Sequence, residues 1–166
     1  EKVKVYELAQ KTDDNFVENN AWKKNVLFIT GGGNQTEDDL FSTYLNGLKT
    51  IISDSLYGAH SYSLRKMPTV AAPNASSLAE YISRGLGLIS YFGHGASTTI
   101  GYGELSDPAV FNNNGKYPVV FTSGCDVGDC YSFMGGRSTT INNITERYML
   151  DKGVGAVGFM AETYLG

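Results

Sequence analysis

A histidine and a cysteine, each beside glycine, follow two apolar runs of this sequence. His94 lies between Gly93 and Gly95 in "ISYFGHGAS", and Cys125 lies one glycine after the run "PVVFTS". A thiolate can attack a carbonyl carbon, and an imidazole can deliver a proton to the leaving amine. If the two side chains lie together, they form the minimum equipment for nucleophilic acyl transfer.

The neighbouring glycines fit the same chemistry. Gly93 and Gly95 leave space for a peptide backbone, and the amides of Gly95 and Cys125 could stabilise a developing oxyanion. We place Gly93, Gly124 and Asp126 among the predicted substrate-binding residues. Taken singly, a cysteine after a strand is more often a small core residue, and a histidine is more often a satisfied polar group. The combination at one sheet edge is what favours catalysis.

The elements that must position these residues alternate between apolar runs and helical stretches. This pattern is typical of a mostly parallel sheet with helices on both faces. The predicted strands span residues 26–30, 59–66, 86–92, 118–123 and 154–162, with the second toward an edge because its polar and apolar residues alternate. Parallel strands deliver their following loops to one edge of the sheet. If the third and fourth strands are neighbours, His94 and Cys125 emerge roughly 5 Å apart at the backbone.

Three helices are predicted between these strands. The first has apolar residues at helical spacing over 40–52, with Thr36 and Asp39 as its N-terminal cap. The second runs from a capping box of Ser77 and Glu80 to Gly85. The third covers about 138–152. The connection over 95–116 has little periodicity, and connections of that length are often functional.

Composition limits the classes of partner. A chain of 166 residues with 42% hydrophobic residues can build one domain around a sheet. The formal charge of −4, with acids and bases mixed, predicts no nucleic-acid partner, and no apolar run approaches the roughly 18 residues of a membrane span. The start "EKVKVYELAQ" is neither a signal peptide nor a methionine start, so we expect a piece of a longer protein. Cys125 and Cys130 are too few and too close for a disulfide framework.

Three blocks carry a family resemblance. "GLISYFGHG", "NNNGKYPVVFTSGCDVGD" and "ITERYMLDKGVGAVGFMAET" resemble the gingipain-type cysteine peptidases, a family that includes the sortase of the bacterial type IX secretion system. The wider clan of caspases and legumains shares an apolar block ending in His-Gly and a second block ending in cysteine. The resemblance implies a caspase-like three-layer α/β sandwich, with residues 1–166 forming a single catalytic subdomain.

The resemblance also implies roles for individual residues. It makes Cys125 the nucleophile of a cysteine endopeptidase, His94 the acid and base, and the Gly95 and Cys125 amides the oxyanion hole. A carboxylate can orient the histidine in this family, and Asp38, Asp39 and Glu104 stay open as alternatives. The implied partner is a protein or peptide substrate, and the implied location is secreted or on a bacterial cell surface.

No cofactor or catalytic metal is implied, although the family sometimes binds calcium, which Asp126 and Asp129 could meet. Cys125, Cys130 and His94 fit no usual zinc spacing. Cys130 stands where the family pattern has no cysteine. A surface thiol, a disulfide partner and a residue of the binding cleft stay open as its role.

Other functions remain as alternatives. Hydrolysis and sortase-type transpeptidation share every step up to the acyl-enzyme, so the sequence does not separate them. A catalytically silent scaffold of the same fold is a further reading. A phosphate-binding module is disfavoured, since "TGGGNQTEDDL" has neither nucleotide motif and its acidic residues would repel an anion.

Overall fold

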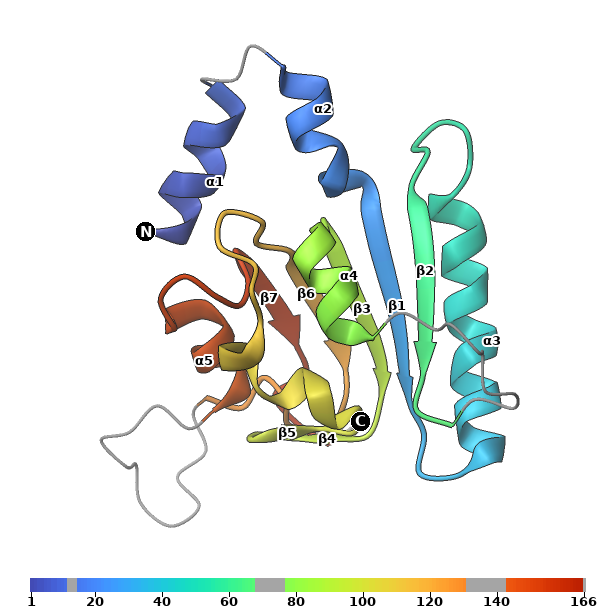
Figure 1. Cartoon of the computed structure of the whole chain (residues 1–166). Coiled ribbons are helices and arrows are strands. Elements are labelled where there is room, and N and C mark those ends of the chain that lie inside the picture. Colours follow the sequence, from blue (N-terminus) through green and yellow to red (C-terminus); the bar gives the residue numbers. More distant parts are fainter. Residues whose placement is uncertain (12–14, 68–76, 131–142, 166) are drawn as a thin grey trace.

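The chain folds around a five-stranded parallel sheet with its carboxyl ends along one edge (Figure 1). The computed structural model describes residues 1–11, 15–67, 77–130 and 143–165. The strand order is β2-β1-β3-β6-β7. The bounds are β1 (Asn25–Gly31), β2 (His60–Arg65), β3 (Leu88–Gly93), β6 (Val119–Ser123) and β7 (Gly158–Ala161). Neighbouring β3 and β6 therefore end side by side, as the site prediction requires.

Helices cover both faces of this sheet. α3 (Gln35–Ile52) packs on one face, and α4 (Leu78–Arg84) and α5 (Ile144–Leu150) pack on the other. The helices α1 (Lys2–Lys11) and α2 (Phe16–Asn20) and the 3-10 turn η1 (Ala21–Lys24) precede β1. The connection from β3 to β6 contains a small hairpin, β4 (Gly95–Ala96) and β5 (Thr99–Ile100), and the 3-10 turns η2 (Gly103–Ser106) and η3 (Pro108–Val110).

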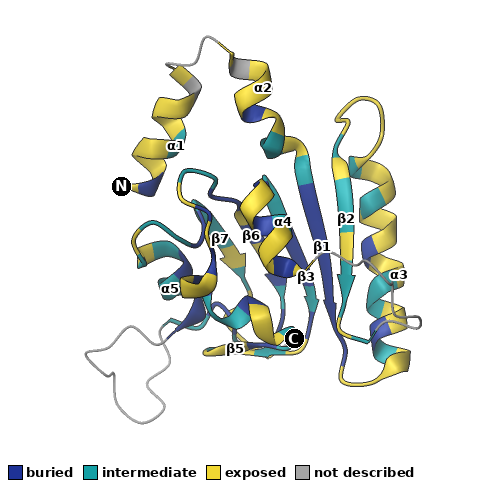
Figure 2. Cartoon of the chain, viewed as in Figure 1, coloured by how far each residue is buried: buried dark blue, intermediate teal, exposed yellow. Residues whose placement is uncertain are grey.

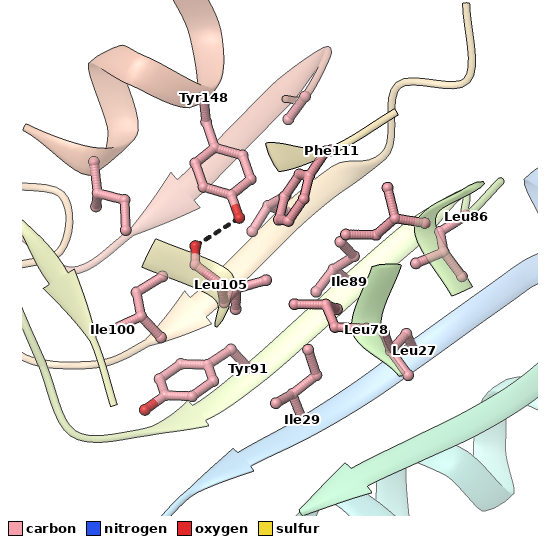
Figure 3. Close-up of a cluster of buried hydrophobic side chains, with 14 of the residues drawn as sticks. Leu27, Ile29, Leu78, Leu86, Ile89, Tyr91, Ile100, Leu105, Phe111 and Tyr148 are labelled. Atoms are coloured by element: carbon pink, nitrogen blue, oxygen red, sulfur yellow. Dashed lines mark hydrogen bonds between the residues drawn. The ribbon is translucent and has the colours of Figure 1, made fainter. Parts of the chain in front are cut away.

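The larger core lies between the sheet and helices α4 and α5 (Figure 3). Leu27 and Ile29 of β1 and Ile89 of β3 are fully buried there. Each such side chain contributes about 1.5–3 kcal/mol through burial. Tyr148 of α5 reaches across this core and donates a hydrogen bond to the Leu105 carbonyl at 2.7 Å. This core anchors the strands that carry His94 and Cys125.

The strand predictions agree with the structure to within two residues, except at the start of the last strand. All five strands are present, and β2 lies at an edge of the sheet. The last strand begins at Gly158 rather than at Val154. The amide of Ala156 donates to the Tyr148 carbonyl, which keeps this stretch beside the end of α5. The predicted α/β class and the mostly parallel sheet are confirmed.

All three predicted helices are present, and the bounds of the first and third differ from the prediction. α4 has the predicted capping box and ends at Gly85, whose φ is 95°. α3 is capped by Asn34, not Thr36, because the extended Asn34 backbone lets its side chain accept from the Glu37 amide. α5 begins after its cap Asn143 and ends at Leu150, and residues 138–142 of the predicted helix lie outside the described residues.

The face under α3 is less completely covered. β1 is buried on both faces, and its burial is visible as a continuous dark run in Figure 2. Farther along the sheet, Phe121 of β6 and Met160 of β7 are exposed. They line an apolar groove with Leu48 and Ile51 of α3. The predicted apolar face of α3 therefore extends beyond the part of the sheet that the helix covers.

Candidate active site

The structure brings the His94 loop and the Cys125 turn together at the carboxyl edge of the sheet. Phe92 of β3 pairs with Ser123 of β6, so the two chains leave the sheet in register. A Cβ atom on Gly95 would lie 3.2 Å from the Cys125 carbonyl oxygen. One on Gly124 would lie 3.1 Å from the Gly93 carbonyl oxygen. The glycines beside His94 and Cys125 thus allow a close approach of two backbones.

Both the amide and the carbonyl of the His94 backbone are hydrogen-bonded. Its amide donates to the Gly31 carbonyl at 3.1 Å. Its carbonyl accepts from the Tyr91 hydroxyl at 2.6 Å and from the Gly101 amide at 2.7 Å. These bonds reach β1, β3 and the segment after β5, so the position of His94 depends on several elements at once.

Tyr91 is built into this arrangement. Its side chain is 1% exposed and lies within the larger core, where Figure 3 shows it beside Ile29 and Ile100. Burial raises the pKa of the Tyr91 phenol far above its ordinary value, so the hydroxyl stays a donor. Cβ atoms on Gly31 and Gly101 would come within 1.9 and 2.7 Å of its oxygen. These glycines therefore make room for the hydroxyl that holds the His94 carbonyl.

The imidazole of His94 is hydrogen-bonded to Glu37 of α3. The Nε2 atom lies 2.9 Å from Glu37 Oε2, which also accepts from the Gly33 amide at 2.9 Å. The hydrogen bond from His94 and then the one from Gly33 lower the pKa of the Glu37 carboxyl, so it is ionised near neutral pH. Phe41 packs its ring edgewise toward the imidazole, with 6.3 Å between ring centroids. The hydrogen bond to Glu37 and the contact with Phe41 therefore orient the imidazole, although the His94 side chain is 59% exposed.

Glu37, the hydrogen-bond partner of His94, is not among the carboxylates that the sequence patterns single out. In the sequence Glu37 belongs to the acidic helix start of "TGGGNQTEDDL", for which Thr36 is the predicted cap. With the cap at Asn34, Glu37 is the third helical residue, four residues after Gly33 in the turn that follows β1. Because β1 and β3 are neighbours, that position faces the loop that carries His94. Assigning the cap to Asn34 in the sequence would therefore have pointed to Glu37 as the partner of His94.

The three predicted orienting carboxylates lie elsewhere. Asp38 is fully buried and accepts from the Gly32 amide at 3.1 Å and from Arg65 Nε at 2.9 Å. Asp39 also pairs with Arg65, which lowers the pKa of its carboxyl. Glu104 is exposed in η2. Within the described residues, the carboxylate paired with His94 is that of Glu37.

The Cys125 turn has an unusual backbone. Asp126 has a φ of 57°, the only positive value among the described residues other than glycine. The Asp126 amide donates to the Tyr164 carbonyl at 3.2 Å, and the Gly128 amide donates to the Glu162 carbonyl at 2.7 Å. Strained conformations of this kind concentrate at functional sites. Asp126 itself is half-buried and Gly124 is buried beside the thiol-bearing residue.

Cys125 and Cys130 are both half-buried, and within the described residues neither forms a disulfide. The described residues also hold no cluster of three or more His, Cys, Asp or Glu side chains arranged for a metal ion. The calcium expectation stays a prediction. Among the described residues, no helix is long and apolar enough to cross a bilayer.

Two solved structures share this fold. The arginine-specific cysteine proteinase gingipain R (RgpB) matches with a TM-score of 0.66 and 20% identity, over 98% of this chain and 37% of that chain. The complex of the pro- and mature domains of RgpB from Porphyromonas gingivalis matches with a TM-score of 0.62 and 19% identity, over the same shares. The chain thus spans 37% of the length of these gingipain chains.

No curated protein sequence matches the chain. The model of one family, described as peptidase family C25, matches residues 1–166. With the parallel sheet and its gingipain neighbours, this match confirms the resemblance seen in the sequence blocks. The chain belongs to peptidase family C25, the gingipain-type cysteine peptidases.

Proposed function

We propose that this chain is the catalytic part of a cysteine endopeptidase, with Cys125 as nucleophile and His94 as acid and base. The observation that carries the proposal is the Glu37–His94 hydrogen bond, at the edge of the sheet where the Cys125 turn meets the His94 loop. A base oriented by a third group beside a nucleophile is the general pattern of such sites. A silent scaffold would need no such orientation.

In the proposed reaction, the imidazole takes the thiol proton of Cys125 and the thiolate attacks the carbonyl carbon of a peptide bond. The imidazolium then gives its proton to the leaving amine as the C–N bond breaks, leaving a thioester. Water adds to the thioester, His94 accepts a proton from it, and the thiolate is expelled with release of the acid. Because Nε2 is held by Glu37, Nδ1 is the nitrogen left for these transfers.

The other predicted site residues keep supporting roles in the proposal. The amides of Gly95 and Cys125 stabilise the oxyanion of the tetrahedral intermediate. Gly93 and Gly124 are predicted to bind substrate, but both are buried against neighbouring backbone, so in the proposal they let the two loops of the site lie close together. Asp126 stands next to the nucleophile, where its carboxylate would meet polar groups of the substrate.

Transpeptidation is the alternative fate of the same thioester. An amine in place of water would resolve it without any change in the residues. A secreted or cell-surface location, including export by a type IX system, rests on the family resemblance and stays a prediction. One gingipain neighbour is described as arginine-specific, so arginyl peptide amides are the first substrates to try.

The test is the rate of alkylation of each cysteine by iodoacetamide, followed by peptide mass spectrometry across pH. We expect Cys125 to react faster than Cys130 near neutral pH, and its rate to fall at least about tenfold in His94→Ala. His60→Ala is the matched control, because His60 is the only other histidine and begins β2 at the opposite end of the sheet.

If Cys125 is inert in the wild-type protein, or indifferent to His94→Ala, the enzyme proposal fails. Once reactivity is shown, product analysis of an arginyl peptide with and without an added amine separates hydrolysis from transfer. A new peptide–amine product that grows with amine concentration would favour the transpeptidase.

A further inference from the structure

The turn after β1 connects the carboxylate of Glu37 to the backbone of His94. The Gly31 carbonyl accepts from the His94 amide, and the Gly33 amide donates to Glu37 at 2.9 Å. Between them, the Gly32 amide donates to Asp38 at 3.1 Å. Each of these three consecutive glycines therefore makes a hydrogen bond through its backbone. The bond of Gly31 is to His94, and the bond of Gly33 is to the carboxylate that binds the His94 ring.

Asp38 is the buried centre of this turn. Its side chain is fully buried, and a Cβ on Gly32 would lie 2.5 Å from its amide nitrogen. One carboxylate oxygen binds the Gly32 amide, and the other binds Arg65 Nε at 2.9 Å and the Met67 amide at 3.4 Å. A buried carboxylate with these donors fixes the turn against the first residues of α3.

Arg65 ties this centre to the end of β2. Its guanidinium binds Asp38 through Nε and Asp39 through Nη2, so it holds two successive carboxylates of α3. The hydrogen bond to Asp39, and then the one to Asp38, raise the pKa of Arg65 above its ordinary value. The planar fork of arginine suits such a double contact, which a lysine cannot reproduce. Arg65 thereby fixes the rotation of the helix turn from which Glu37 projects.

We propose that Asp38 and Arg65 are positioning residues for His94. They act on the imidazole through Glu37, which the Gly33 amide and the start of α3 hold in place, and they touch neither the imidazole nor the substrate. This inference rests on the proposed function, in which the orientation of the imidazole sets the reactivity of Cys125. A misplacement of about 1 Å in such a group can slow a reaction about a hundredfold.

A double-mutant cycle tests this route. We measure iodoacetamide alkylation of Cys125 in the full chain, across pH, for Asp38→Asn, Glu37→Gln and the double variant. Asparagine keeps an oxygen for the Gly32 amide but turns an NH₂ group toward the donors of Arg65 and Met67. We expect Asp38→Asn to slow Cys125 about tenfold or more and to shift its pH profile. In the Glu37→Gln background the same change should slow it less than about twofold.

A second ion pair of the molecule provides the control. Asp107 accepts from the Ala109 amide and pairs with Arg147 of α5, so it resembles Asp38 in chemistry but not in its link to His94. Asp107→Asn should leave the Cys125 rate within about twofold of wild type. If Asp38→Asn does not fold, Arg65→Gln takes its place in the cycle. Arg65→Lys should restore part of the lost rate by keeping the charge.

Three outcomes overturn the inference while the proposed function stands. One is a fast, His94-dependent Cys125 that Asp38→Asn does not slow. The second is equal slowing by Asp38→Asn with and without Glu37, and the third is equal slowing by Asp107→Asn. Either of these two would make Asp38 a purely structural residue. A wild-type Cys125 that does not react, or that ignores His94→Ala, overturns both proposals.

Discussion

The two reactive loops are held in place by different parts of the molecule. The His94 loop is bonded to Gly31 of β1 and to Tyr91 of β3, two strands that lie deep in the sheet. The Cys125 turn is bonded to the carbonyls of Glu162 and Tyr164, which follow the edge strand β7. The histidine is therefore tied to the central strands, whereas the Cys125 turn, although Val127 packs in the core, also depends on the segment after the edge strand.

This difference has a consequence for stability. Residues tied to buried central strands open only with the whole domain, whereas segments at a sheet edge open more readily. We infer that perturbations at the end of β7 change the cysteine first, and that perturbations of β1 change the histidine only with a loss of global stability. Substitutions on each side of the site can break or sharpen this contrast.

The largest effect is expected where the two loops touch. A Cβ in Gly95→Ala would lie 2.5 Å from Val127 Cγ2 and 3.2 Å from the Cys125 carbonyl, so the loops must separate. We expect about 1–3 kcal/mol of lost stability and at least about tenfold slower alkylation of Cys125. Gly103→Ala is the control, because its Cβ would meet no atom within 4 Å. Normal reactivity in Gly95→Ala would show that the close approach is not needed.

A smaller effect is expected on the histidine side. Tyr91→Phe removes the hydroxyl that donates to the His94 carbonyl, while the Gly101 amide still donates to it. We expect about 1 kcal/mol of lost stability, measured by urea unfolding, together with a fewfold slower alkylation of Cys125. Tyr148→Phe removes a matched buried hydrogen bond, to the Leu105 carbonyl. It should lose similar stability without the change in alkylation, and equal alkylation in both variants would contradict a positioning role for Tyr91.

The same contrast explains what could be predicted from the sequence. The strands and the place of His94 and Cys125 follow from local patterns, since each residue comes directly after an apolar run. Glu37 lies 57 residues from its partner His94, and the contact depends on the order of β1 and β3 and on which residue caps α3. The predicted cap, Thr36, is two residues from the observed cap, Asn34, and a shift of that size changes which carboxylate faces the site. Sequence patterns rarely fix a helix start that closely.

The pairing of Asp38 and Asp39 could not be predicted from the sequence for another reason. Asp38 and Asp39 look like a solvated helix start, but Arg65 from the next strand pairs with both. A long-range ion pair leaves no periodic trace in either segment. The strained backbone of Asp126 could not be predicted from the sequence either, because aspartate is common in ordinary turns.

The ionisation of Glu37 should depend on His94. Its pKa is lowered mainly by the hydrogen bond from His94, so His94→Ala should raise it toward the ordinary glutamate value. Since the folded pKa is the lower one, the stabilising interaction is present above the ordinary pKa and is lost as pH falls through the folded value. Carboxyl carbon NMR titration measures the shift. The pKa of Asp39, lowered by Arg65, should not move, and an unmoved Glu37 would contradict the pairing.

The smallest effect is expected in the Cys125 turn itself. Asp126 has a left-handed backbone, which costs an L-residue about 1 kcal/mol or more. In Asp126→Gly the relief of that strain is offset by the roughly 0.5–1 kcal/mol that glycine loses in chain entropy, so the free energy of unfolding should change little. Asp126→Ala keeps the strain without the local hydrogen bonding of aspartate, and should lose about 1 kcal/mol in urea unfolding. Equal stability of the two variants would mean that the segment after β7, rather than the local backbone, sets the shape of this turn.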